Sequence, residues 1–335
     1  MGADYDQTDH SLAVGVIADA FARAIAAAAD YAGATSPNPP VGCVLLDEAG
    51  EILAVEAHRK AGELHAEARA IAACRSAGTM DRIHTVVVTL EPCNHHGRTP
   101  PCAEAILSTS AREVWIAETD PNPRVEGGGA AHLKSEGVSV RFLSELDHPD
   151  AARLAGEAER LIAPFAKWVT TGRPFVTIKQ ALDEAGSMIP PKGQRTFTSE
   201  TSLTLAHRMR RRADAILTGN ATILADNPEF TVRRVPDHPG KSRILAILDR
   251  TGRVPADYLT EATRRGLRPM LFAEIGDALA RLGTEGVHEV LVEAGPTITA
   301  AILASDLWDE HVTIKRIGDG SPDHITVSRN NHKKG

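Results

Sequence analysis

The stretch that decides the fold runs from His65 to Cys102. It reads HAEARAIAACRSAG (65–78), TVVVTLEPC (85–93) and, after eight more residues, Cys102. Residues 65–77 predict a helix, and the β-branched run 85–90 predicts a strand that ends just before Pro92 and Cys93. A second helix is expected to begin at Cys102. One imidazole and two thiols therefore stand at the ends of neighbouring elements, which indicates a metal site on an α/β framework.

These residue types suit Zn²⁺. One histidine and two cysteines fill three tetrahedral positions, and a catalytic zinc keeps the fourth position for water. Glu67 lies two residues beyond His65 and is free to carry protons between that water and a leaving group. The order His-x-Glu, Pro-Cys, Cys is typical of zinc-dependent nucleobase and nucleoside deaminases. The alternative is a closed structural site with His95 or His96 as the fourth ligand.

Composition narrows the class of protein. A chain of 335 residues favours two domains. The net charge of −7 argues against a nucleic-acid partner, which would require clustered Lys and Arg. No apolar stretch approaches the roughly 20 residues of a membrane helix. The polar start, residues 1–10, is unlike a signal peptide, and the sparse cysteines fit a reducing cytoplasm. We therefore expect a cytoplasmic enzyme without a membrane partner.

Both halves of the chain alternate between strand and helix patterns, which predicts a mainly parallel sheet layered with helices in each half. A break at Asp147–Asp150 and a helix over 151–169 separate them. The predicted domains are 1–147 and 172–335, with 148–171 as a linker helix. The predicted strands are 41–47, 51–57, 85–90, 113–117, 138–142, 175–181, 215–218, 243–248, 269–273, 289–293 and 311–315. The predicted helices are 11–34, 65–77, 102–108, 130–136, 151–169, 202–212, 277–282 and 297–304.

The first half resembles the deaminase half of the bifunctional riboflavin-biosynthesis deaminase–reductase family. The resemblance rests on residues 89–102, 37–42, 58–67 and 120–123. It implies a three-layer domain like that of cytidine deaminase, with Glu67 as the catalytic residue beside zinc. The implied substrate is 2,5-diamino-6-ribosylamino-4(3H)-pyrimidinone 5′-phosphate, from which the exocyclic 2-amino group would be lost. The implied substrate contacts are Asn38, His58, His95 and Arg98.

The second half resembles the reductase half of the same family, an α/β domain similar to dihydrofolate reductase. The matching residues lie around 179, 210, 214–219, 221–228, 230–233 and 292–297. The resemblance implies reduction of the ribosyl group to a ribityl chain by NADPH. It implies substrate contacts at Lys179, Arg210, Phe230, Arg233 and Glu293. It implies cofactor contacts at Ala181, Thr222, Asp226, Gly295, Pro296 and Thr297, where a turn at a helix N-terminus suits a pyrophosphate.

The second half also departs from the family pattern. Residues 182–187 replace Ser-Leu-Asp-Gly, residues 196–199 replace Trp-Ile-Thr-Ser, and the chain ends early in polar residues. One alternative is therefore a deaminase with an impaired reductase half. A nucleoside or tRNA deaminase and a zinc-stabilised binding module are two others. No Gly-x-Gly-x-x-Gly follows a predicted strand, so a Rossmann cofactor site is not supported. Because members of the family commonly associate, we expect a homo-oligomer.

Overall fold

The computed structural model describes residues 12–94, 100–122, 128–190, 196–318 and 321–330. Contacts divide the chain into two units, one up to Ala163 and the other from Pro164 onward. The division falls inside helix α5 (Ala151–Thr171), at the proline in that helix. Proline interrupts the helical hydrogen-bond ladder, so it suits a change of packing partner. The domain limits at 147 and 172 stay predictions.

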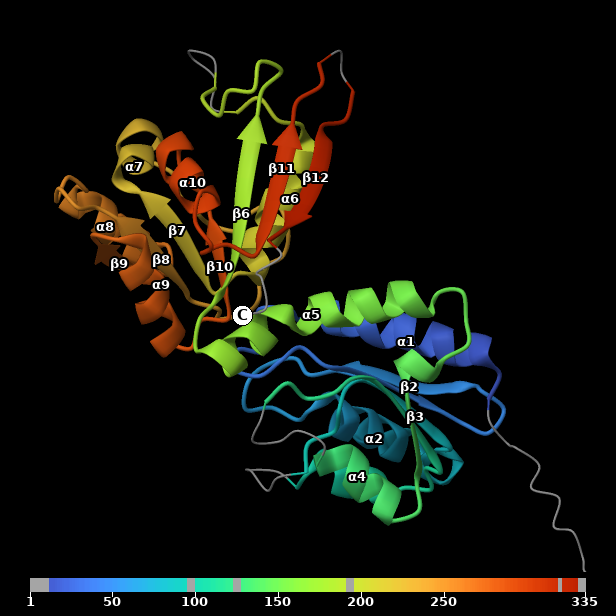
Figure 1. Cartoon of the computed structure of the whole chain (residues 1–335). Coiled ribbons are helices and arrows are strands. Elements are labelled where there is room, and N and C mark those ends of the chain that lie inside the picture. The colour runs from blue at the N-terminus through green and yellow to red at the C-terminus, as the bar shows by residue number, and fades with distance from the viewer. Residues whose placement is uncertain (1–11, 95–99, 123–127, 191–195, 319–320, 331–335) are drawn as a thin grey trace, which may run out of the picture. The chain divides into compact units, whose positions relative to one another are not determined.

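The first unit is built on a five-stranded sheet of order β2-β1-β3-β4-β5 (Figure 1). The strands are β1 (Gly42–Leu46), β2 (Ile52–Ala57), β3 (Thr85–Leu90), β4 (Glu113–Glu118) and β5 (Ser139–Phe142). Strands β3, β4 and β5 are parallel, whereas β1 is antiparallel to both β2 and β3. The first sheet is therefore mixed, because a hairpin with Gly50 at φ +83° joins β1 to β2.

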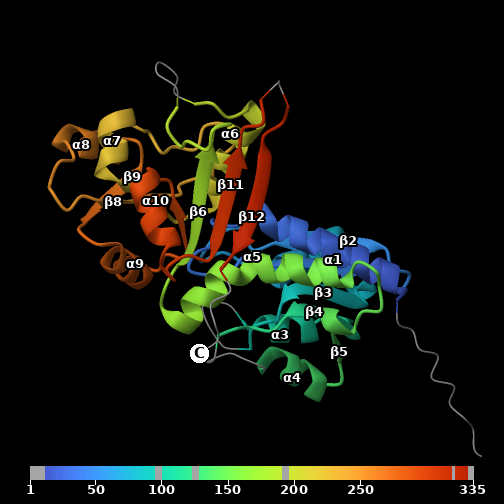
Figure 2. The same ribbon diagram turned by 45° about the horizontal axis from the view of Figure 1, so that its top comes forward.

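Helices cover both faces of this sheet. Helix α1 (Val14–Ala29) and the first part of α5 pack on one face, where Phe21, Trp115 and Leu154 belong to one apolar cluster. On the other face lie α2 (Ala66–Ala77), α3 (Cys102–Leu107) and α4 (Gly128–Ser135), as Figures 1 and 2 show. Two apolar clusters, one on each side of the sheet, produce the predicted three-layer arrangement. Two short 3₁₀ turns, 80–82 and 143–145, complete the unit.

The second unit has a seven-stranded sheet of order β12-β11-β6-β10-β7-β8-β9. All its neighbouring strands are parallel except the pair β11–β12. The strands are β6 (Phe175–Leu182), β7 (Ala215–Gly219), β8 (Arg243–Leu248), β9 (Leu267–Phe272), β10 (Glu289–Val292), β11 (Glu310–Lys315) and β12 (His324–Arg329). The helices are α6 (Glu200–Arg212), α7 (Asn220–Asp226), α8 (Ala256–Arg264), α9 (Ile275–Thr284) and α10 (Pro296–Leu303).

Two apolar clusters fix these helices on opposite faces of the second sheet. Helices α9 and α10 pack on one cluster through Leu282 and Ile302, and α7 and α8 pack on the other through Ile223 and Tyr258. This doubly covered, mostly parallel sheet is the predicted class. Its carboxyl ends, where ligands bind in such sheets, carry Leu182, Gly219 and the turn after Val292.

The end of α5 is fixed to the second unit by polar contacts. Lys167 Nζ lies 2.6 and 2.7 Å from the carboxylate oxygens of Asp309, and the indole N–H of Trp168 donates to Gly283 O at 2.9 Å.

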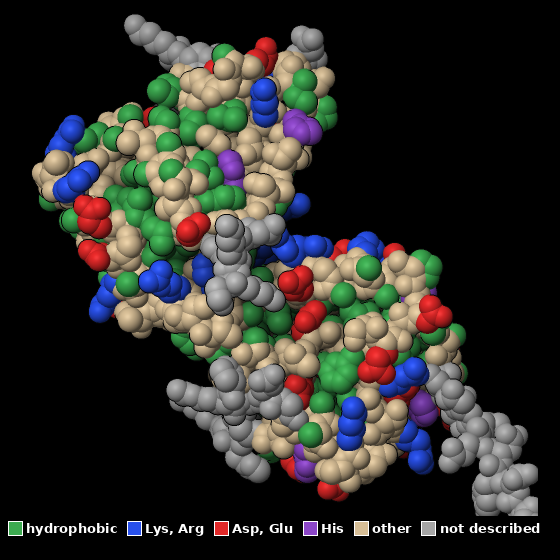
Figure 3. Space-filling model, in the orientation of Figure 1, with side chains coloured by type: hydrophobic (Ala, Val, Ile, Leu, Met, Phe, Trp, Pro, Cys, Tyr) green, Lys and Arg blue, Asp and Glu red, His purple; other side chains and the backbone are tan. Residues whose placement is uncertain are grey.

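Among the helices described, none is both long and apolar enough to span a bilayer. Within each unit, the face seen in Figure 3 carries acidic as well as basic side chains, and that mixture does not resemble a nucleic-acid surface.

Candidate functional site

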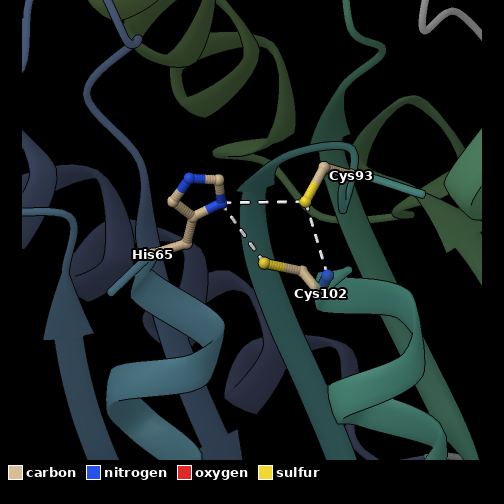
Figure 4. Close-up of side chains that lie close together, drawn as sticks. All are labelled: His65, Cys93 and Cys102. Atoms are coloured by element: carbon tan, nitrogen blue, oxygen red, sulfur yellow. Dashed lines mark hydrogen bonds between the residues drawn. The ribbon is translucent and has the colours of Figure 1, made fainter. Parts of the chain in front are cut away.

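The three predicted metal ligands come together in the first unit (Figure 4). His65 immediately precedes α2, Cys93 follows the end of β3, and Cys102 is the first residue of α3. Their ligand atoms all lie within 4.8 Å of one another. His65 Nδ1 is 3.7 Å from Cys93 Sγ and 3.4 Å from Cys102 Sγ. The sequence motif is thus a spatial cluster.

The distances suit one tetrahedral ion. Zn–S bonds of about 2.3 Å and Zn–N bonds of about 2.0–2.1 Å place the nitrogen and a sulfur about 3.6 Å apart around zinc. The two observed nitrogen–sulfur distances, 3.4 and 3.7 Å, bracket that value. The donor set is also the soft one that zinc prefers. The residue types and these two distances therefore fit a site for Zn²⁺.

The surroundings favour a thiolate at Cys93. Hydrogen bonding with the Cys102 thiol is the main cause that lowers the pKa of Cys93 to about 4, and His65 adds to the effect. The backbone N–H of Cys102 also donates to Cys93 Sγ at 3.4 Å. The pKa of Cys102 is raised well above its ordinary value, first by the side-chain hydrogen bond with Cys93 and then by burial. A metal would displace the remaining thiol proton, because zinc binds cysteine as the thiolate.

Glu67 lies in the first turn of α2, close to this cluster, and is only 3% exposed. Its Oε2 is buried without a hydrogen-bond partner among the described residues. Burial raises the pKa of this carboxyl group, and the positive charge of His65 opposes the shift. Buried polar atoms in proteins normally have partners. The Glu67 carboxyl group also hydrogen-bonds with the Cys102 thiol, so one of its oxygens lacks a partner while the group as a whole contacts the ligand cluster.

Asn38 and His58 form a hydrogen-bonded pair next to the cluster. His58 is 1% exposed, and its ring meets that of His65 edge-on at 5.2 Å between centroids. His58 Nδ1 lies 3.1 Å from Leu64 O, and because a carbonyl can only accept, Nδ1 carries the proton. Nε2 then accepts from Asn38 Nδ2 at 3.2 Å. Burial lowers the pKa of His58, which favours this neutral form.

Two predicted substrate contacts of the first unit, His95 and Arg98, lie outside the described residues. A further residue of this region, Glu91, was not predicted from sequence. It is buried directly before the Pro-Cys pair and accepts hydrogen bonds from the backbone of Asp120 and Ala130. Its position next to the motif was the only signal that could have pointed to it.

In the second unit, the predicted substrate contacts Arg210 and Glu293 form a bidentate ion pair. Arg210 Nε and Nη2 lie 2.8 and 2.6 Å from the two oxygens of Glu293. Lys179 Nζ is 3.9 Å from the same carboxylate. Burial opposes ionisation of Glu293, but the charges of Arg210 and Lys179 outweigh it and lower the pKa to about 2. Glu293 is therefore an anion at neutral pH.

The loop that carries Phe230 and Arg233 lies against this pair. Arg210 Nη1 donates to Thr231 O at 3.3 Å, and its guanidinium lies 5.9 Å from the Phe230 ring centroid. Phe230 is buried and has φ +54°. This left-handed backbone conformation is energetically unfavourable for a residue with a large side chain. Arg233 is exposed. Such strain persists where surrounding contacts fix the backbone, and it is common at binding sites.

His207 is one of those contacts and was missed from sequence. It lies one turn before Arg210 on α6, is 3% exposed, and its Nδ1 accepts the backbone N–H of Arg233 at 3.1 Å. Burial is the main cause that lowers its pKa to about 4, with Arg210 and Arg233 contributing. The helical spacing to Arg210 was the available signal.

The predicted cofactor residues cluster where β10 ends. Gly295 precedes α10, its N–H donates to Thr222 Oγ1 at 3.1 Å, and Pro296 is the first residue of the helix. The exposed Thr297 follows, while Asp226 is the exposed last residue of α7 and Ala181 lies near the end of β6. A cavity of about 350 Å³ adjoins this turn. Its lining includes Met188, Ile189, Pro296, Thr299 and Leu303.

Comparison with known proteins matches each unit to a family. Residues 17–118 match the cytidine and deoxycytidylate deaminase zinc-binding region, and residues 174–315 match the RibD C-terminal domain. The riboflavin biosynthesis protein RibD of Escherichia coli (strain K12) is 32% identical over 322 residues, covering 86% of this chain and 84% of the relative. That of Corynebacterium ammoniagenes is 35% identical over 298 residues, with 88% and 84% covered.

Solved structures also resemble most of the chain, and two of them are described here. One is the diaminohydroxyphosphoribosylaminopyrimidine deaminase/5-amino-6-(5-phosphoribosylamino)uracil reductase of Thermotoga maritima, with a TM-score of 0.79 and 29% identity. It covers 92% of this chain and 90% of its own. The other is a form of Acinetobacter baumannii RibD, with a TM-score of 0.74, 28% identity, and 93% and 90% covered. Both likenesses extend over the two units.

Proposed function

This chain belongs to the RibD family of bifunctional riboflavin-biosynthesis deaminase–reductases, and on that premise we propose how its residues divide the two reactions. The protein is a riboflavin-biosynthesis enzyme, both a hydrolase and an oxidoreductase, with zinc in its deaminase domain and NADPH as the reductant. A deaminase without a working reductase is not favoured, because the reductase family match spans residues 174–315 despite the departures from the family pattern.

We propose that His65, Cys93 and Cys102 hold the zinc ion. Their ligand atoms lie within 4.8 Å of one another, and the nitrogen–sulfur distances of 3.4 and 3.7 Å support a shared ion. Zinc lowers the pKa of a bound water to about 7 and so makes it a nucleophile at neutral pH. The first unit is proposed to act on 2,5-diamino-6-ribosylamino-4(3H)-pyrimidinone 5′-phosphate. With zinc bound, the oxygen of its water would add to C2, the exocyclic C–N bond would break, and ammonia would leave.

In this scheme Glu67 moves the protons. It takes one from the attacking water and delivers it to the departing amine, so the carboxylate is regenerated within each turnover. The single observation that carries this role is the buried, unpartnered Oε2 beside the ligand cluster. We propose that Asn38 binds the pyrimidine. Because His58 already accepts from the amide nitrogen of Asn38, the side-chain oxygen of Asn38 is left to accept from the base.

The second unit is proposed to reduce the ribosyl group at the carboxyl ends of β6 and β10. NADPH would supply the hydride and solvent the accompanying proton. The turn at Gly295, Pro296 and Thr297 is proposed to bind the pyrophosphate of NADPH through backbone N–H groups. Thr222, Ala181 and Asp226 are the other proposed cofactor contacts. Thr222 is supported by its hydrogen bond to Gly295.

Charge decides the roles of the proposed substrate contacts in this unit. Glu293, with its pKa near 2, cannot act as a proton donor at neutral pH, so it is proposed to accept hydrogen bonds from ribose hydroxyls. Lys179 and Arg210 hold Glu293 in place and add positive charge for the phosphate ester. Phe230 and Arg233 are proposed to close the site from the loop fixed by His207.

A homo-oligomeric state and a cytoplasmic location are also proposed. The four cysteines are free thiols, and two of them sit in the candidate zinc site. Unpaired thiols that must stay reduced to bind metal suit a reducing compartment.

A coupled assay tests both reactions. The purified chain is given the diaminopyrimidine phosphate with and without NADPH, and ammonia release and NADPH oxidation are followed separately. We expect ammonia release in both cases and NADPH oxidation that requires the deaminated product. Ammonia release without any NADPH oxidation would show that the second unit does not reduce this substrate. NADPH oxidation without ammonia release would remove the proposed deamination step.

A further inference from the structure

Glu91 links the strand that leads to Cys93 with two other segments of the first unit. Its backbone N–H donates to Glu118 O at 2.9 Å, so the chain is still paired at the end of β3. Its carboxylate accepts from Ala130 N at 2.9 Å and from Asp120 N at 3.4 Å. The residue is 5% exposed. These two side-chain hydrogen bonds are called the carboxylate clamp below.

The carboxylate clamp gives hydrogen-bond partners both to the first turn of α4 and to the buried Glu91 carboxylate. Ala130 is the third residue of α4, and the first N–H groups of a helix have no partner inside it. The carboxylate supplies that partner and places negative charge at the positive end of the helix. A buried carboxylate in turn needs N–H donors, because its desolvation is otherwise costly. The position is thus chemically specific for an acidic side chain rather than an apolar one.

Pro92 and Asn94, the two neighbours of Cys93 in the chain, both contact the first turn of α4. A Cβ atom on Gly129 would lie 1.8 Å from Pro92 O, so the helix backbone and the Pro92 carbonyl are in direct contact. Asn94 Nδ2 donates to Gly128 O at 3.2 Å. Cys93 therefore lies between two residues that are both fixed to α4. Pro92 also has a fixed φ, which limits the movement of the backbone that leads into Cys93.

We propose that Glu91 is a positioning residue for the zinc ligand Cys93, acting through the carboxylate clamp. The inference rests on the zinc site proposed above. Metal ligands must be held within about 0.5 Å of their productive geometry by the residues around them. When the carboxylate clamp is lost, the segment that carries Cys93 samples other positions. Zinc must then order that segment as it binds, so its affinity falls.

The test measures zinc affinity of the full chain by competition with a chromophoric chelator. Loss of partners that orient metal ligands typically weakens metal binding by about 10–100-fold, which is the effect expected for Glu91→Ala. Glu91→Gln keeps the shape and one acceptor oxygen, so we expect about a tenfold loss. At saturating zinc, deamination by Glu91→Gln should largely return, because the residue does not touch the reacting atoms.

Glu113→Gln is the matched control. Glu113 is also 5% exposed and begins the adjacent strand β4, at the end away from Cys93, because Thr85 pairs with Glu113 and Leu90 with Glu118. We expect it to keep the zinc affinity of the unmodified chain, whatever its effect on unfolding by urea. Equal zinc affinities for Glu91→Gln, Glu91→Ala and Glu113→Gln would overturn the proposal. Cys93→Ser separates failure of the proposed zinc ligand set from failure of the proposed role of Glu91. If it keeps full zinc affinity the ligand set is wrong, whereas if it alone loses zinc only the role of Glu91 fails.

Discussion

Two buried glutamates, one in each unit, have opposite tendencies to ionise. Glu67 is 3% exposed and Glu293 is 7% exposed. Burial raises the pKa of Glu67, whereas Arg210 and Lys179 overcome burial at Glu293 and lower its pKa to about 2. Burial alone therefore does not decide the charge of a carboxyl group. The number and distance of its cationic partners do, and they separate a proton carrier from a permanent anion.

The strongest test of this contrast is Glu67→Ala. General acid–base catalysis is worth about 10²–10⁴-fold in rate, so we expect ammonia release to fall by that factor. Bound zinc, measured by elemental analysis, should stay at the level of the unmodified chain, because Glu67 is not a proposed ligand. NADPH oxidation with deaminated substrate serves as the internal control and should not change. Unaltered ammonia release would remove Glu67 from the mechanism.

Removal of Arg210, the partner of Glu293, should lower both the stability of the fold and the rate of NADPH oxidation. Arg210→Met leaves Glu293 buried with only Lys179 nearby, and removal of one partner of a buried pair costs about 3–5 kcal/mol. We expect the lower end of that range in urea unfolding, because Lys179 remains, together with loss of NADPH oxidation. Addition of Glu293→Gln should recover part of the stability.

Arg212→Met is the matched control for this variant. Arg212 lies on the same helix and pairs with Glu289, at the start of β10 rather than at its end. We expect destabilisation by Arg212→Met with reductase turnover retained in the folded fraction. If both variants lose turnover equally, the Arg210–Glu293 pair serves the fold and not the substrate.

Unfolding measured at several pH values separates the contribution of His207 to stability from that of Glu293. The pKa of His207 is about 4 in the folded chain against 6.5 ordinarily. Between these values the unfolded chain binds the proton and the folded chain does not, so stability falls as pH falls through this window. The slope is at most about 1.4 kcal/mol per pH unit. Glu293, with its lowered pKa, loses its contribution only below about pH 4.5, its ordinary value.

His207→Gln should flatten that dependence between pH 6.5 and 4, since glutamine can still accept from Arg233 N–H but does not titrate. Urea midpoints at several pH values measure the effect. The exposed His324 is the control, and His324→Gln should leave the slope unchanged. A slope that stays the same in His207→Gln would mean that other groups produce the acid sensitivity.

The smallest expected effect concerns the cofactor turn. Thr222→Val removes the hydroxyl that accepts from Gly295 N–H and keeps the shape of the side chain. A single hydrogen bond is worth about 0.5–1.5 kcal/mol, which corresponds to roughly 2–10-fold weaker NADPH binding. Titration of NADPH fluorescence checks the change, and ammonia release should not respond. Unchanged affinity would place the pyrophosphate elsewhere.

The sequence predicted the elements whose burial pattern is strong. Strand β3 and strand β8 have the predicted bounds, because their apolar runs are buried along most or all of their length. Helix α7, helix α8 and strand β12 were not predicted. Strand β12 is exposed at all six positions, so no alternation marked it. The hairpin β1–β2 makes the first sheet mixed, which the expectation of a mainly parallel sheet did not capture.

The same division holds for the site. The clustering of His65, Cys93 and Cys102 could be predicted, because imidazole and thiolate groups are the donors that zinc binds and the motif that carries them is distinctive. The roles of Glu91 and His207 could not be predicted, because both accept from backbone N–H groups, and any residue type except proline can supply a backbone N–H. Sequence patterns therefore report reactive side chains well, and they report poorly the hydrogen bonds that hold such side chains in place.

The contact between Gly129 and the Pro92 carbonyl is another structural requirement that a sequence pattern does not reveal. Gly129 has no acidic, basic, metal-binding or charged side chain. Even a methyl group at this position would clash with the Pro92 carbonyl, next to the proposed zinc ligand Cys93. A saturation screen scored only by turnover would rank this position beside the reactive residues. In such a screen, intolerance to substitution identifies positions that have no room for a side chain as well as positions that need a reactive one.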